Sequence, residues 1–187
     1  AFIDPCLPTR AGWPPEGEGW VHEIKHDGIR LQVHVTPGRV RLLTMTGVDW
    51  TERYLRIAAS AARLPGQAII DAEGVVPGPD GIADFEAIMS RRHDGEAVAY
   101  AFDLMMLDGE DLRQLPLTER KARLQELLSA AFGTGRRKGR GTWIEPLHRP
   151  ALIYSEHMSG DGPTVYSHAC KLGLEGIVSK RLDSKYR

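Results

Sequence analysis

Two cysteines in 187 residues exclude a small disulfide-rich scaffold. Cys6 and Cys170 lie far apart and belong to no C-x-x-C pair, a pattern typical of reduced thiols rather than of a disulfide or a metal site. A chain of this length can bury a packed core without disulfide bonds. The low cysteine content therefore favours a reducing cytoplasmic location.

Long hydrophobic runs are also missing. No apolar stretch approaches the ~18 residues of a membrane span, and the opening Ala-Phe-Ile-Asp-Pro does not resemble a signal peptide. The seven histidines show no pair at ligand spacing, which argues against a histidine metal site. We expect a soluble, cytoplasmic protein that has no membrane partner.

Neither sign of charge dominates, because the formal net charge is −1. Binding to DNA requires basic residues clustered on one face, and a total charge neither supports nor excludes such a cluster. Hydrophobic residues make up 42% and charged residues 26% of the chain, as in ordinary globular proteins. The length suits one domain, or one domain with two lobes.

The hydrophobic pattern predicts a mixed α+β domain. Apolar and polar residues alternate in the expected strands, which are 20–25, 29–35, 39–43, 67–76, 97–107, 142–145, 151–156 and 176–181. Apolar residues recur at helical spacing in the expected helices, which are 52–64, 82–91, 118–131 with Thr118 as its cap, and 162–172. Because helices interrupt the strands irregularly, we expect antiparallel pairing rather than a doubly wound sheet.

Residues 133–141, Gly-Thr-Gly-Arg-Arg-Lys-Gly-Arg-Gly, predict a basic loop between the third helix and the next strand. Such loops are most often simply solvated, and contact with DNA is the alternative.

The most informative segment is 23–30, Glu-Ile-Lys-His-Asp-Gly-Ile-Arg. It places Lys25 at the end of a strand, and a lysine whose pKa is lowered by burial or neighbouring cations can act as a nucleophile. Asp27 would orient the amine or a metal, and Arg30 would bind an anion. The alternative for so short a motif is a β-hairpin in which Lys25 is a solvated turn residue.

Three later segments place carboxylates in or beside apolar strands. Residues 69–76 contain Asp71 and Glu73, which are costly to bury unless they face a metal, a hydroxyl group or a cation. In residues 100–104 an aromatic ring stands beside a carboxylate, where it belongs to the core or stacks on a base. Residues 175–181, Glu-Gly-Ile-Val-Ser-Lys-Arg, begin with a carboxylate and end with cations.

Taken in this order, the segments resemble the nucleotidyltransferase (adenylation) domain of ATP-dependent DNA ligases, most closely the ligase module of bacterial end-joining ligases. The matching segments are the nucleophile motif at 23–30, the acidic strand at 71–76, the Phe-Asp-Leu-Met-Met-Leu-Asp-Gly segment at 102–109, the Leu-Pro-Leu-Thr-Glu-Arg-Lys segment at 115–121 and the Glu-Gly-Ile-Val-x-Lys-Arg motif at 175–181. The resemblance covers essentially the whole chain. It implies an ATP-grasp-like α+β fold with largely antiparallel sheets flanked by helices.

The resemblance also implies a mechanism and a set of site residues. Lys25 would attack the α-phosphate of ATP, AMP would pass to a DNA 5′-phosphate, and a 3′-hydroxyl would displace AMP. The implied catalytic residues are Lys25, Asp27 and Glu175. The implied nucleotide-binding residues are Glu23, Ile24, Arg30, Glu73, Phe102, Arg120 and Lys180.

Individual roles follow from the same resemblance. Phe102 would stack on adenine, with Glu23 near its exocyclic amine, and Glu73 would contact the ribose. Arg30 and Lys180 would hold phosphate oxygens, and Arg120 would reach the nucleotide. Mg²⁺ or Mn²⁺ would be bound by Glu73 and Glu175. The implied partners are ATP and nicked or broken duplex DNA in the nucleoid of a bacterium.

The sequence departs from the family pattern in two places. Met45 stands where these ligases usually carry a phosphate-binding arginine, whose fork of donors methionine lacks. The sequence also stops at Arg187, before the family's last lysine motif and its OB-fold domain. We therefore expect residues 1–187 to be an adenylation domain truncated before these parts, with the missing OB-fold as a partner.

Two alternatives remain at this point. An RNA ligase or an mRNA capping guanylyltransferase shares the Lys-x-Asp-Gly motif, although the motif at 175–181 favours a DNA ligase. A non-catalytic nucleotide- or nick-binding module would account for Met45 and for the missing motif, but the intact Lys25-His-Asp-Gly sequence argues against it.

Overall fold

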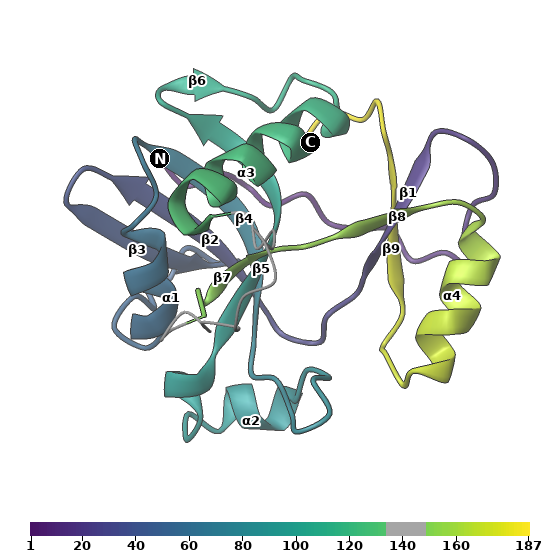
Figure 1. Ribbon diagram of the computed structural model, residues 1–187, viewed down its shortest axis with the longest axis horizontal. Helices are drawn as coiled ribbons and strands as arrows, with labels where there is room; N and C mark the ends of the chain where they lie inside the picture. Colours follow the sequence, from purple (N-terminus) through teal and green to yellow (C-terminus); the bar gives the residue numbers. More distant parts are fainter. Residues whose placement is uncertain (134–148) are drawn as a thin grey trace, which may run out of the picture.

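A computed structural model describes residues 1–133 and 149–187. The expected strand at 142–145 and almost all of the expected basic loop at 133–141 lie outside these residues. In the described part the chain forms two sheets that stand side by side, each covered by helix (Figure 1).

The larger sheet has six strands in the order β3-β2-β4-β5-β6, with β7 paired to β5. Its strands are β2 (Ile29–Thr36), β3 (Arg39–Thr44), β4 (Ala68–Val75), β5 (Val98–Leu107), β6 (Glu110–Asp111) and β7 (Leu152–Tyr154). All pairs are antiparallel except β5 with β7, which is parallel. The expectation of antiparallel pairing is therefore correct for most of the sheet and wrong for β7, because the chain passes through α3 before it returns to β5.

The smaller sheet joins segments from both halves of the chain. Its strands, in the order β8-β1-β9, are β8 (His157–Ser159), β1 (Trp20–Ile24) and β9 (Ile177–Arg181), and all are antiparallel. Helix α4 (Gly162–Lys171) connects β8 to β9 and packs against β1 and β9 (Figure 1). Asp161 caps α4, because its side chain accepts a hydrogen bond from the Thr164 amide.

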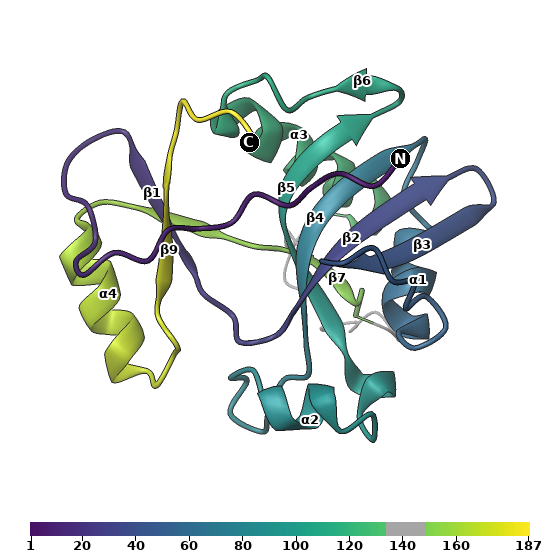
Figure 2. The same cartoon turned by 180° about the vertical axis from the view of Figure 1, so that it is seen from behind.

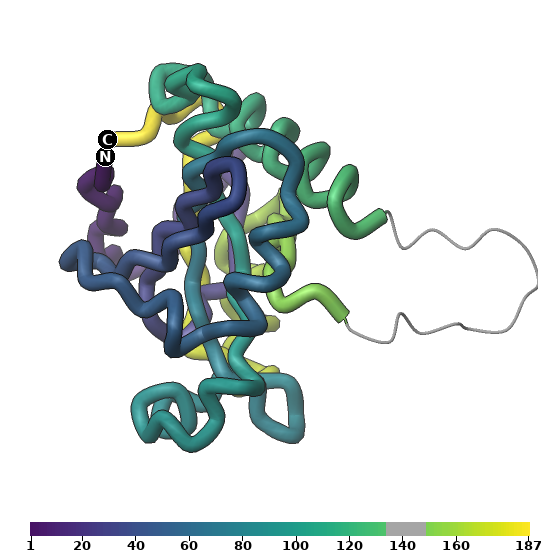
Figure 3. Tube along the Cα trace, turned by 90° about the vertical axis from the view of Figure 1, so that its left-hand side faces the viewer, coloured from purple at the N-terminus to yellow at the C-terminus, as the bar shows by residue number. Residues whose placement is uncertain are grey.

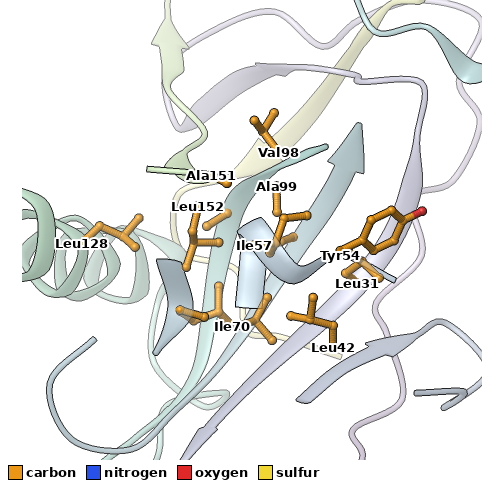
Figure 4. Packing of buried hydrophobic residues seen from close by; sticks show 14 of the residues in the cluster. Leu31, Leu42, Tyr54, Ile57, Ile70, Val98, Ala99, Leu128, Ala151 and Leu152 are labelled. Carbon is orange, nitrogen blue, oxygen red and sulfur yellow. The ribbon is translucent and has the colours of Figure 1, made fainter. Parts of the chain in front are cut away.

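The main core lies between the larger sheet and helices α1 (Leu55–Ala61) and α3 (Leu117–Phe132). Ile57 of α1, Ile70 of β4 and Leu128 of α3 gather in this layer (Figure 4). The N-terminal segment crosses the opposite face of the sheet from α3 (Figures 2 and 3). There Ile3 packs with Met105 and Tyr186 in a second, smaller cluster.

The helices are shorter than expected or begin elsewhere. Residues expected as a helix at 52–64 form helix only over α1, because Tyr54 turns the chain before it. The expected helix at 82–91 is α2 (Phe85–Met89), capped by Asp84, and a short 3₁₀ turn, η1 (Asp94–Glu96), follows it.

Thr118 is not the cap of α3, so that prediction was wrong. The helix begins at Leu117. Pro116 stands at the N-cap position, and its side chain makes no capping hydrogen bond. The amide of Thr118 donates instead to the carbonyl of Leu182, so a distant segment satisfies an amide that a cap would otherwise serve. No helix in the described residues is long and apolar enough to cross a membrane.

Candidate nucleotide-binding site

A cavity of about 350 Å³ lies where the two sheets meet. Eight of the residues expected in the site line it, namely Glu23, Ile24, Lys25, Arg30, Glu73, Phe102, Arg120 and Lys180. They come from β1, β2, β4, β5, α3 and β9, so their convergence depends on the tertiary fold. Glu175 joins them through Lys25. Asp27 is exposed and does not line the cavity.

Lys25 follows the last residue of β1 and is held there by the start of β9. Its amide donates to the carbonyl of Gly176 at 3.0 Å, and its Nζ donates to Glu175 Oε1. The side chains of this pair are 43% and 40% exposed. The amine therefore stands at the cavity with one carboxylate partner and open access from solvent.

Gly28 brings the chain from Lys25 onto β2. A Cβ atom there would lie 2.2 Å from the carbonyl oxygen of Gly74 on β4, so no larger residue fits without a backbone shift. This close approach fixes Lys25 beside Glu73, which neighbours Gly74.

Glu73 is a carboxyl group of the cavity wall whose pKa is shifted toward neutral pH. Burial raises its pKa to about 7, while Arg30 acts in the opposite direction. A group with this pKa exchanges protons readily near neutral pH, and a cation bound beside it would favour its ionised form.

Arg30 is anchored to the protein rather than free in the cavity. Its Nε donates to Asp71 Oδ1 at 2.5 Å, and its Nη2 donates to Asp71 Oδ2 at 2.7 Å and to the carbonyl of Cys6 at 3.1 Å. Tyr186 also donates to Asp71, which is fully buried. Burial opposes the charge most strongly, but the hydrogen bond to Asp71 and the negative charges nearby together outweigh it and raise the pKa of Arg30. Asp71 is therefore the counterion of this arginine, a role that the sequence did not reveal.

A bulge in β5 turns Phe102 toward the cavity. Asp71 pairs with Asp103 and Ala72 pairs with Ala101, so one step on β4 spans two on β5 and Phe102 falls between. Consecutive residues of a regular strand point to opposite faces, yet Phe102 and Asp103 both line the cavity. The Arg30 guanidinium and the Lys180 Nζ each lie 4.5 Å from the Phe102 ring centroid.

Arg120 is held by four hydrogen bonds within the protein. It donates to both oxygens of Asp103, at 2.7 and 3.0 Å, and to the carbonyls of Leu115 and Ser184 at 2.6 and 2.8 Å. The arginine and aspartate side chains are only 2% and 6% exposed. The geometry thus gives Arg120 a bracing position in the cavity wall, where the sequence had suggested contact with the nucleotide.

Lys121 is a site residue that the sequence analysis missed. Its Nζ donates to Glu23 Oε1 at 2.7 Å, and Lys180 Nζ donates to the other oxygen, Oε2, at 2.8 Å. Lys121 lies on the same helical face as Leu117, Leu124 and Leu128, three to seven residues away. A lysine on the apolar face of a helix was the available signal, because such a charge requires a buried partner.

The carboxylates of the cavity can serve a divalent cation only together with a ligand. In the described part of the chain no group of three or more His, Cys, Asp or Glu residues could hold a metal ion. The charge of Glu175 contributes to the raised pKa of Glu73, and Lys25, the ion-pair partner of Glu175, acts in the opposite direction. Mg²⁺ commonly binds through one or two carboxylates plus substrate phosphates, so this pair fits an ion brought with a polyphosphate.

Comparison with protein families gives a match over residues 15–187 to the ATP dependent DNA ligase domain. The multifunctional non-homologous end joining protein LigD of Pseudomonas aeruginosa is 40% identical over 190 residues, a match that covers 100% of this chain and 21% of that protein. The chain thus spans about a fifth of the length of this relative.

Solved structures agree with the sequence match. The ligase domain of Mycobacterium tuberculosis LigD superposes with a TM-score of 0.81 at 30% identity, over 99% of this chain and 56% of that one. A mycobacterial DNA ligase D complexed with ATP and MES gives a TM-score of 0.80 at 30% identity, with the same coverage. The α+β fold with antiparallel sheets is therefore the ligase nucleotidyltransferase fold.

Proposed function

The chain belongs to the family of ATP-dependent DNA ligase domains, homologous to the LigD ligase module, and we propose that its cavity carries out lysine adenylation. The observation that supports this most is the convergence on one cavity of Lys25, directly after β1, with Glu73, Phe102 and Lys180 from three other strands. A lysine in a solvated turn is not expected to line a cavity together with these groups.

In the first step Lys25 Nζ attacks the α-phosphorus of ATP. A nitrogen–phosphorus bond forms, the bond to the β-phosphate oxygen breaks, and pyrophosphate leaves. The amine must be neutral when it attacks, and Glu175, which already accepts a hydrogen bond from Nζ, takes the proton. Asp27, which is exposed and follows Lys25 by two residues, helps to orient the approach.

Other residues of the cavity hold the nucleotide. The ring of Phe102 stacks on adenine, and Glu23 with Ile24 borders the base edge. Glu73 contacts the ribose, and Lys180 holds phosphate oxygens. Arg30 and Arg120 act mainly through Asp71 and Asp103, which fix the positions of the strands that carry these groups.

Glu73 and Glu175 would hold Mg²⁺ or Mn²⁺ together with the phosphates, and the ion would neutralise charge on the transferring phosphoryl group. A bound cation would also favour the ionised form of Glu73, whose pKa is raised because burial outweighs the positive charge nearby.

In the later steps AMP moves from Lys25 to a DNA 5′-phosphate, and a 3′-hydroxyl then displaces AMP as the new phosphodiester forms. We propose that the whole protein does this at nicks or breaks in bacterial DNA, in the cytoplasm, with an OB-fold domain closing over the duplex. The homology to proteins of non-homologous end joining supports this assignment.

Covalent labelling tests the first step. Wild-type protein incubated with α-labelled ATP and Mg²⁺ should retain label after denaturation, whereas Lys25→Ala should retain none and should melt at the same temperature as the wild type. GTP in place of ATP should give no label, which separates this function from a capping guanylyltransferase. Covalent AMP on the Lys25→Ala protein would refute the assignment of the nucleophile.

A further inference from the structure

Glu23 lies almost fully buried between two lysines, only one of which reaches the cavity. The side chains of Glu23 and Lys121 are 4% and 3% exposed. Lys180 is 20% exposed and lines the cavity, whereas Lys121 stands behind the cavity wall. Each lysine occupies a different oxygen of the same carboxylate.

Lys121 is fastened to the wall from behind at several points. Besides Glu23, its Nζ donates to the carbonyl of Ser155 at 3.0 Å and lies 3.5 Å from the carbonyl of Phe102. It also sits 4.7 Å from the ring centroid of Tyr154. Lys121 therefore keeps several partners if its contact with Glu23 changes, whereas the contacts of Lys180 among the described residues are Glu23 and the Phe102 ring.

We propose that Lys121 is a positioning residue that keeps Glu23 neutralised, so that Lys180 can leave Glu23 and bind the phosphates of an incoming nucleotide. This inference rests on the proposed function of the cavity. The physical reason is the cost of a buried, unpaired carboxylate. With Lys121 present, departure of Lys180 leaves Glu23 with one cation. Without Lys121 it would leave Glu23 with none, and Lys180 would be retained.

The test compares a ligand that has phosphates with one that lacks them. Affinities for ATP and for adenosine are measured with EDTA present, on the full-length protein that carries this chain, for the wild type and Lys121→Met. Methionine has a similar length and no charge. We expect ATP to bind on the order of tenfold more weakly to Lys121→Met, the effect of about one charge-assisted hydrogen bond, and adenosine to bind equally to both.

A general loss of structure would give a different result. If Lys121 only stabilised the fold, Lys121→Met would bind both ATP and adenosine more weakly, and the proposal would be overturned. Equal affinities of the variant and the wild type for ATP would also overturn it. Covalent labelling of the wild type, measured in parallel, decides the proposed function separately, since wild-type protein that takes no label refutes adenylation whatever Lys121 does.

A second pair of variants removes the dependence on a stable Lys121→Met protein. Glu23→Gln has no buried charge to leave behind, so in that background a further Lys121→Met change should leave the ratio of ATP to adenosine affinity unchanged. A drop in this ratio when Lys121→Met is added to Glu23→Gln would show that Lys121 does not act through Glu23.

Discussion

Two pairs of opposite charge border the same cavity and differ mainly in their burial. Lys25 and Glu175 are 43% and 40% exposed, whereas Arg120 and Asp103 are 2% and 6% exposed. The exposed pair has one hydrogen bond between its members, and the buried arginine is fixed by four. The comparison teaches that similar ion pairs serve different purposes here: the buried pair shapes the wall, and the exposed pair remains free to exchange partners.

Breaking the buried pair should have the largest effect. Asp103→Asn leaves the Arg120 charge buried without its counterion, and we expect the free energy of unfolding to fall by about 3–5 kcal/mol. Urea denaturation followed by circular dichroism measures this change. Arg123→Gln is the matched control, because the side chains of Arg123 and its partner Glu110 are 34% and 57% exposed and the pair should contribute less than about 1 kcal/mol. Equal losses in the two variants would contradict the distinction.

Breaking the exposed pair should change activity and leave stability nearly intact. Glu175→Gln removes the acceptor of the Lys25 proton, so we expect the rate of lysyl-AMP formation to fall on the order of 10²–10³-fold. The free energy of unfolding should change by less than about 1 kcal/mol, as for other exposed ion pairs. Single-turnover labelling and thermal melting together check this prediction. A strongly destabilised Glu175→Gln protein would show that the exposed pair is structural as well.

Phe102 lines the same cavity. Replacing it should have a smaller effect than breaking either ion pair. Phe102→Leu keeps an apolar side chain but removes the aromatic face, and we expect KM for ATP in the labelling reaction to rise about 3–10-fold, as for the loss of one stacking contact. Phe132→Leu, an aromatic residue at the end of α3 away from the cavity lining, is the control. A KM that does not change for Phe102→Leu would argue that adenine lies elsewhere.

His34 offers the smallest expected effect and a case of partial burial without an opposite charge. It lies on β2 across from Arg41 and hydrogen-bonds Gln32 rather than a carboxylate. Burial, with a contribution from Arg41, lowers its pKa to about 4. As pH falls below about 6.5 the unfolded chain binds a proton that the folded chain does not, so stability is lost between pH 6.5 and 4.

Replacing this histidine should reduce that pH dependence. His34→Gln cannot titrate, so its stability should decline less than that of the wild type when denaturation is measured at pH 7, 6, 5 and 4. Parallel stability curves for the two proteins would show that His34 does not contribute.

Much of the fold could be predicted from the sequence, because strand alternation is a local property. The strands around Lys25, Glu73 and Lys180 begin and end within one or two residues of the expected positions. The start of α3 could not be predicted in this way, because the Thr118 amide is satisfied by Leu182, more than sixty residues away. Strand β6 was missed because two exposed acidic residues carry no alternating pattern.

The candidate site shows the same division. Its motifs identified Lys25, Glu73, Phe102 and Lys180, which line one cavity. They also suggested that Arg30 and Arg120 contact the nucleotide, although each is bound to a buried aspartate. A motif specifies which residue types stand at which spacing, but it does not specify which counterion lies opposite.

The sequence by itself determined the local elements and the chemical groups, since hydrophobic alternation and the Lys-x-Asp-Gly and Glu-Gly-Ile-Val-x-Lys-Arg segments are contained in short stretches of chain. Only the tertiary structure decided which charges are buried together. The bulge that turns Phe102 to the cavity and the sharing of Glu23 by Lys121 and Lys180 both depend on segments that lie far apart in the sequence. The physical reason is that the energy of a charge depends on its burial and its neighbours, which strands and helices acquire only when they pack.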